Sequence, residues 1–123
     1  MQESKKNPLY KSFGYAFAGI FTGIRKERNM KIHCLAMFGV ICAGILLQIS
    51  ALEWCICFVL FGLILSLELV NTAVEAVVDL VTEEKKPLAK IAKDTAAGAV
   101  LISAIMAVIV GCILFIPRLL DIL

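Results

Sequence analysis

The sequence has no recognisable secretory signal, because its first apolar run begins only at Ile32 and no small-residue cleavage site follows a short apolar stretch. We therefore expect the chain to be retained whole. It also lacks internal repeats, low-complexity tracts and linkers, which favours a single domain over residues 1–123. The cysteines are odd in number and all lie in apolar runs, so we expect no disulfide framework and interpret them as small apolar helix residues: Cys34, Cys42, Cys55, Cys57 and Cys112.

Apolar residues are present in excess. They make up 61% of the chain, and the mean hydropathy is +0.95, whereas a soluble globular domain is about 45–50% apolar. The excess lies in long runs, and a helix needs about 20 mostly apolar residues to cross the hydrocarbon core. We predict an all-α integral membrane protein with three transmembrane helices, over residues 32–49, 54–80 and 92–117, the last ending at Pro117.

The basic residues are distributed unevenly around these spans. Seven precede the first span and four lie between the second and the third, whereas the short loop near residues 50–53 has none. Because cytoplasmic loops carry the excess of lysine and arginine, we place the N-terminus and the loop over residues 82–94, which contains Pro87, in the cytoplasm. The first loop and the C-terminus then face the outside, where we expect Glu53 and Asp121 to be solvated.

The segment before the first span carries bulky apolar residues at gaps of three and four, which fit one face of a helix: Tyr10, Phe13, Phe17, Ile20, Phe21 and Ile24. We predict an amphipathic helix over residues 9–27, lying on the cytoplasmic membrane surface. The alternative is a soluble-facing cap over the spans. We expect residues 26–31 to form a charged turn, and we interpret His33 as an interface residue rather than a ligand.

The second span carries four polar residues, Glu68, Asn71, Glu75 and Asp79. At 100° per residue, Asn71 lies about 60° from Glu68, and the other two lie within about 20° of it, so all four line one helix face. Counting 1.5 Å per residue from Trp54, an expected outer anchor, puts Glu68 about 21 Å along a core about 30 Å thick. An ionisable residue inside a span is costly and is therefore first interpreted as functional.

Acidic side chains stacked on one stripe repel one another and need a cation to stay ionised together. Carboxylate oxygens at a membrane–cytosol boundary suit Mg²⁺, which keeps some of its waters and binds substrate phosphates. We expect Glu27, before the first span, and Lys93 and Asp94, at the start of the third, to reach this level, with Glu68 deeper. Such a layout fits phosphoryl transfer from Mg-ATP to a lipid hydroxyl, with a carboxylate accepting the hydroxyl proton.

Other interpretations remain open. No Walker A motif or glycine-rich kinase loop is present. Intramembrane carboxylates also serve proton relays, so a small oligomeric proton-coupled transporter or channel is one alternative. Another is a non-catalytic assembly subunit that uses Asn71 and Gly98 as helix contacts, with the stripe as a polar seam between protomers. Position favours the kinase, because transporter sites lie near the bilayer midplane and this cluster is displaced toward the cytosolic edge.

The run Glu68-Leu-Val-Asn71-Thr-Ala-Val-Glu75-Ala-Val-Val-Asp79, followed by Ala92-Lys93-Asp94 and the small residues at 96–99, resembles the small prokaryotic diacylglycerol kinase family. Gly14-Tyr15, Gly19-Ile20 and Glu27-Arg28-Asn29 agree with it, and the resemblance covers residues 10–117. It implies a homotrimer of three-span subunits in the bacterial cytoplasmic membrane, with sites shared between neighbouring protomers. It also implies ATP and a membrane lipid alcohol as partners, Mg²⁺ as cofactor, and no nucleic acid.

The resemblance also implies a role for each matching residue. Glu68 would accept the proton of the lipid hydroxyl and contact the lipid substrate, and Asn71 would orient the catalytic site. Glu27 and Glu75 would bind the metal of Mg-ATP. The nucleotide would be contacted by a larger set, comprising Tyr15, Glu27, Glu75, Asp79, Glu84, Lys86, Lys93 and Asp94.

Two segments bear on the branch of the family. Residues Glu27–His33 are similar to the Gram-positive branch, which prefers undecaprenol, so the implied activity is a lipid kinase that makes undecaprenyl phosphate. The alternative is a diacylglycerol kinase that makes phosphatidic acid. The loop at Glu84–Lys86 reads Glu-Lys-Lys, where the proteobacterial relatives have an aromatic residue and a histidine.

Overall fold

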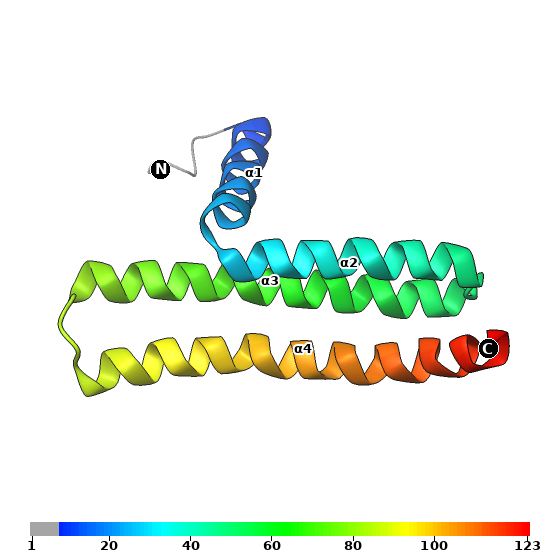
Figure 1. Ribbon diagram of the computed structural model, residues 1–123. Helices are drawn as coiled ribbons and strands as arrows, with labels where there is room; N and C mark the ends of the chain where they lie inside the picture. Colours follow the sequence, from blue (N-terminus) through cyan, green and yellow to red (C-terminus); the bar gives the residue numbers. More distant parts are fainter. Residues whose placement is uncertain (1–7) are drawn as a thin grey trace.

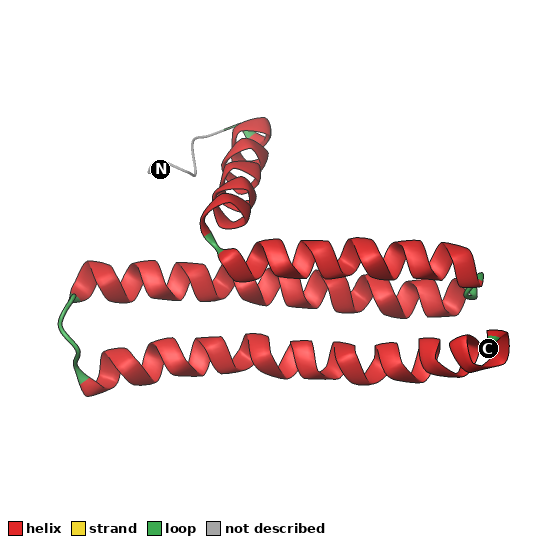
Figure 2. Cartoon of the chain, in the orientation of Figure 1, coloured by secondary structure: helices red, strands yellow, loops and turns green. Residues whose placement is uncertain are grey.

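The computed structural model describes residues 8–123 and shows four helices, with no strand among those residues. They are α1 (Leu9–Lys26), α2 (Arg28–Leu47), α3 (Ala51–Val81) and α4 (Pro87–Ile122) (Figure 1). Only short connections separate them (Figure 2). Helices α2, α3 and α4 are each long and apolar enough to cross a membrane, which confirms the all-helical fold class and the three candidate spans.

The three long helices lie side by side as a bundle, and α1 stands off from it at a steep angle (Figure 1). Helix α3 is central, because it contacts each of the other three helices. One end of the bundle holds the turn at residues 48–50 and the C-terminus, and we call it the hairpin end. The opposite end holds the connection at residues 82–86, and we call it the loop end.

Very little of the apolar surface is buried within one chain. Among residues 8–123, five apolar side chains are buried, namely Met30, Ile49, Cys57, Ile64 and Val100, whereas bulky ones such as Leu35, Val59 and Leu80 are more than two-thirds exposed. Soluble monomers rarely expose apolar patches of this extent. The outward faces of the spans therefore need lipid or another protein surface to cover them.

Three local expectations from the sequence are wrong. Residues 26–31 are not a turn: Glu27 alone separates α1 from α2, and the ammonium of Lys31 donates across this joint to the Arg25 carbonyl oxygen at 2.7 Å. Pro87 is the first residue of α4 rather than part of the loop, because its missing N–H is not needed at that position. Pro117 does not end the third span, since α4 continues to Ile122.

Close packing near the joint holds α1 and α2 against α3. Gly23 is buried, and a Cβ added there would collide with the Leu69 side chain. Met30, in the first turn of α2, is 1% exposed and lies beside Gly23. Glycine at position 23 therefore permits a close approach that brings the start of α2 next to residue 69, and so next to its neighbour Glu68.

The hairpin end is held by specific polar contacts. Ser50 caps α3: its hydroxyl accepts from the Glu53 N–H, and the Glu53 carboxylate accepts from the Ser50 N–H. The same carboxylate accepts two bonds from the Arg118 guanidinium of α4, at 2.7 and 2.9 Å. The expectation that Glu53 is simply solvated is therefore wrong, because it closes this end of the bundle.

Candidate functional site

Glu68 and Asn71 lie in α3 and are buried, with exposed fractions of 1% and 6%. Both carboxylate oxygens of Glu68 and the amide oxygen of Asn71 have no hydrogen-bond partner among the described residues. Buried polar groups are normally satisfied, because leaving one unpaired costs about 1–3 kcal/mol. Three such atoms within one helical turn indicate a site that awaits a ligand or another chain.

These two residues open onto a cleft of about 390 Å³ between three helices, which we call the Glu68 cleft. Helix α2 contributes Asn29, Ile32 and His33 to its lining. Helix α4 contributes an apolar wall that includes two small residues, made up of Ala97, Val100, Leu101 and Ala104. A polar floor with apolar walls suits a molecule that carries one reactive polar group on an apolar body.

His33 lies directly beside the acidic floor of this cleft. Its Nε2 is 3.5 Å from Oε1 of Glu68, and its side chain is 18% exposed. Its interpretation as an interface residue did not include this contact. Asn29, one turn earlier, lines the same cleft and was also not predicted. The spacing of four between them was the available signal, since residues four apart share a helix face.

A second group of charges lies farther along α3, around Glu75. The half-buried carboxylate of Glu75 feels the negative charges of Glu27 and Glu68. The positive charge of Lys93 acts on it in the opposite sense, and the side chain of Asn71 approaches it. Glu27 from the joint between α1 and α2, Glu75 from α3 and Lys93 from α4 are thus close enough for their charges to act on one another, as the sequence predicted.

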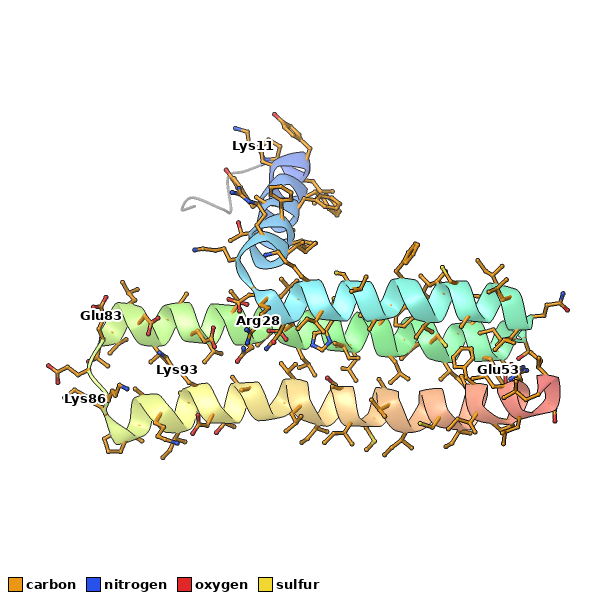
Figure 3. All side chains as sticks on the ribbon, viewed as in Figure 1. Lys11, Arg28, Glu53, Glu83, Lys86 and Lys93 are labelled. Carbon is orange, nitrogen blue, oxygen red and sulfur yellow. The ribbon has the colours of Figure 1, made fainter. Side chains whose placement is uncertain are left out.

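Lys93 links this group to Asp79. Its Nζ lies 2.7 Å from Oδ1 of Asp79, with the lysine side chain 41% exposed and the aspartate 55% exposed. Figure 3 shows Lys93 on α4 between the loop end and Arg28. The ammonium is therefore held near Glu75 by a partner one turn away on α3.

A second cleft, of about 320 Å³, lies at the loop end, between the last turn of α3 and the first turns of α4. Four of the predicted nucleotide contacts line it: Glu84, Lys86, Lys93 and Asp94. Two of these already have local partners, since Lys86 pairs with Glu84 at 3.2 Å and Asp94 pairs with Lys90. Both ion pairs are exposed and contribute little to stability. A charged ligand can therefore replace one partner of either pair at little cost in free energy.

Tyr15 is the predicted contact that the chain does not bring to the others. It lies on α1 and is 55% exposed. Among residues 8–123, no hydrogen bond joins it to the acidic residues of α3. Its predicted role therefore has no support from the geometry of a single chain.

The predicted metal ligands fit a hydrated cation rather than a preformed metal centre. Among the described residues, no group of three or more histidine, cysteine, aspartate or glutamate side chains is arranged to hold a metal ion. Glu27 and Glu75 supply two carboxylates within electrostatic reach of each other. Mg²⁺ is typically held by one or two carboxylates together with waters and substrate phosphates, so this pair fits an ion that arrives with its nucleotide.

Sequence comparisons match nearly the whole chain to known proteins. Residues 14–115 match the family described as prokaryotic diacylglycerol kinase. The undecaprenol kinase of Bacillus subtilis is 47% identical over 113 residues, covering 92% of both chains. The diacylglycerol kinase of Synechocystis is also 47% identical, over 94% of this chain and 66% of its own. The diacylglycerol kinase of Escherichia coli K12 is 31% identical over 86% of this chain and 87% of its own.

Proposed function

Because the chain belongs to the prokaryotic diacylglycerol kinase family and is a multi-pass lipid kinase, we propose that it transfers the γ-phosphoryl group of ATP to undecaprenol. The product is undecaprenyl phosphate. Diacylglycerol, which would give phosphatidic acid, is the alternative acceptor. The observation that carries this proposal is the buried Glu68 carboxylate, whose oxygens are unpartnered in a cleft with apolar walls.

In the proposed reaction, the lipid hydroxyl enters the Glu68 cleft with its tail along the apolar wall of α4. Glu68 takes the hydroxyl proton as the oxygen attacks the γ-phosphorus, and the bond from that phosphorus to the bridging oxygen of ADP breaks. Asn71, one turn along α3, orients the carboxylate and the acceptor. The burial of Glu68 beside the apolar wall of α4 supports this role, because a polar floor with apolar walls suits an alcohol with an apolar tail.

The charged group around Glu75 serves the nucleotide. A Mg²⁺ ion held here with ATP would supply positive charge to the phosphate oxygens. Glu27 and Glu75 hold the ion, and Lys93, positioned by Asp79, offers a positive charge to the phosphates. The remaining nucleotide contacts that we propose lie at the loop-end cleft and on α1, at Glu84, Lys86, Asp94 and Tyr15.

The charge distribution supports a topology. We place the N-terminus and residues 82–86 in the cytoplasm of a bacterium, and the hairpin end and C-terminus outside, because the basic residues cluster before α2 and near the start of α4. Helix α1 then lies on the inner membrane surface, where its exposed aromatic residues Tyr10, Phe13 and Phe17 enter the headgroup region.

We also propose that three copies assemble into a homotrimer with shared sites. The support is indirect. Glu75 is only half-buried and Asp79 is exposed in one chain, and charged groups at membrane depth normally face protein or water rather than lipid. A neighbouring copy covers them and brings its own α1 toward the site.

The choice of undecaprenol rests on resemblance. The Bacillus subtilis relative matches over nearly the whole length of both chains. The segment Glu27–His33 is similar to the Gram-positive branch. The equal identity to the Synechocystis diacylglycerol kinase is the reason to test both acceptors side by side.

The test uses purified protein in detergent micelles with Mg-γ-labelled ATP and either undecaprenol or diacylglycerol. We expect label in the lipid extract, faster with undecaprenol. Glu68→Gln serves as the matched inactive control. Faster labelling of diacylglycerol would replace undecaprenol as the substrate, and absence of label from both lipids would refute the lipid kinase assignment itself.

A further inference from the structure

The buried Glu68 carboxylate has one basic neighbour. Among the described residues, His33 is the only one whose charged or chargeable nitrogen reaches it at ion-pair distance, with 3.5 Å between Nε2 and Oε1. The opposite wall of the cleft, on α4, is formed by alanine, valine and leucine and offers no hydrogen-bonding side chain. A side chain that reaches this carboxylate from across the cleft therefore comes from α2 and not from α4.

The first turns of α2 are built to put His33 in that place. The side chains of Leu69 and Met30 both lie against Gly23 at the end of α1, which fixes the start of α2 near the α3 residue adjacent to Glu68. From there, Asn29 and His33 lie one turn apart on the face that lines the cleft. The imidazole is 18% exposed, so it is partly shielded from water yet still borders the space where an acceptor enters.

A carboxylate that accepts a proton has to be ionised, and one of its oxygens has to point toward the hydroxyl that gives up the proton. A hydrogen-bond donor on one oxygen fixes the orientation of the carboxylate and leaves the other oxygen for the substrate. A distance of 3.5 Å is long for a hydrogen bond, but catalytic contacts are often long without substrate and shorten in the reacting complex. An imidazole with its hydrogen on Nε2 is the donor that this geometry supplies.

We propose that His33 is a positioning residue for the catalytic base: it donates from Nε2 to Oε1 of Glu68 and so leaves Oε2 free for the hydroxyl of the lipid. This inference rests on the proposed role of Glu68 as the base. It assigns His33 an effect on turnover and not on lipid affinity, because the imidazole acts through the carboxylate rather than on the substrate.

The test measures kcat, and KM for undecaprenol, in four variants beside the unaltered protein. His33→Ala removes the donor, and we expect kcat to fall about 10- to 100-fold with KM changed less than about twofold, the size expected when a reacting group is misplaced. The amide nitrogen of His33→Gln reaches about as far from the backbone as Nε2, and should restore kcat to within about fivefold. His33→Asn mimics the Nδ1 position instead and should not restore it. Cys34→Ala, the neighbouring residue outside the cleft lining, is the control for local packing.

Each outcome has a distinct meaning. A raised KM with unchanged kcat in His33→Ala would overturn the proposal in favour of direct lipid binding. Equal activity of the Gln and Asn variants would also overturn it, because the effect would then not depend on Nε2. Loss of activity in all three His33 variants with lowered thermal stability would assign a structural role. Inactivity of the unaltered protein toward both lipids would instead remove the proposed function.

Discussion

Polar side chains are treated differently at the hairpin end of the bundle and in the middle of α3. At the hairpin end, polar groups find partners: Glu53 accepts from Arg118 and from the Ser50 N–H, and the Trp54 ring fills the space over Gly44, where even a Cβ would be 2.7 Å from the ring. In the middle of α3, around Glu68 and Asn71, buried polar atoms are left without partners. Both regions belong to the same pair of helices.

The difference indicates where stability and function reside in this chain. A carboxylate with two guanidinium bonds contributes to folding and is unavailable for chemistry. A buried carboxylate with free oxygens lowers stability and is available to a substrate. Natural proteins tolerate such unsatisfied groups mainly at functional sites, where the surrounding fold compensates. Substitutions in the middle of α3 should therefore change mainly activity, whereas substitutions at the hairpin end should change mainly stability.

The largest effect is expected at Glu68. We expect Glu68→Gln to lower kcat at least about 100-fold, since general-base catalysis contributes about 10²–10⁴. Its thermal midpoint should not fall, because glutamine has nearly the same shape and replaces a buried carboxylate by a neutral amide. Turnover and thermal unfolding in detergent measure the two quantities. An active variant would remove Glu68 as the base, and an unfolded one would mean that this region also stabilises the protein.

The next effect concerns metal dependence. We expect Glu75→Gln to raise the Mg²⁺ concentration for half-maximal activity about tenfold, because one of two proposed carboxylate ligands becomes neutral. Glu53→Gln, an identical substitution at the hairpin end, is the matched control and should leave that concentration unchanged. The comparison is a Mg²⁺ titration of initial rates at saturating ATP. The same curve for both variants would refute the assignment of Glu75.

At the hairpin end, the expected effect is on stability alone. Replacing Glu53, Arg118 or both by alanine forms a double-mutant cycle for the bidentate pair. We expect a favourable coupling between the two side chains, because the guanidinium donates two bonds to the carboxylate, with kcat retained. Denaturant unfolding of the four proteins measures it. A coupling near zero would show that the pair is incidental to the closure of this end.

The smallest effect is expected at Gln48, which ends α2 in the left-handed conformation with φ 55°. A non-glycine residue there costs about 1 kcal/mol, so Gln48→Gly should raise the free energy of unfolding by up to about 1 kcal/mol without changing activity. Destabilisation would indicate that the glutamine side chain makes a contact that outweighs the strain.

The sequence predicted the features that depend on short-range periodicity. Hydropathy identified the three long helices, and spacings of three and four placed Glu68, Asn71, Glu75 and Asp79 on one stripe. The sequence did not predict contacts between residues that are far apart in the chain. Glu53 and Arg118 are 65 positions apart, and no local pattern marks them as partners.

Helix bounds at charged segments were also missed, for a different reason. Three of the four residues at 28–31 are polar, yet they begin α2, because packing rather than hydropathy decides where this helix starts. The place of His33 beside Glu68 was not predicted for the same reason, since it depends on how the joint between α1 and α2 packs against α3 near Gly23. Composition alone makes a single histidine near the start of a span look unremarkable.

The single-residue joint at Glu27 also sets the rotational phase of α1. Each residue added to or removed from a helix turns everything beyond it by about 100°. A one-residue insertion between Gly23 and Glu27 would therefore swing Tyr10, Phe13 and Phe17 away from the side they now occupy, even though every one of them is unchanged. The number of residues in this segment therefore determines the direction of these side chains as much as the identity of the residues does.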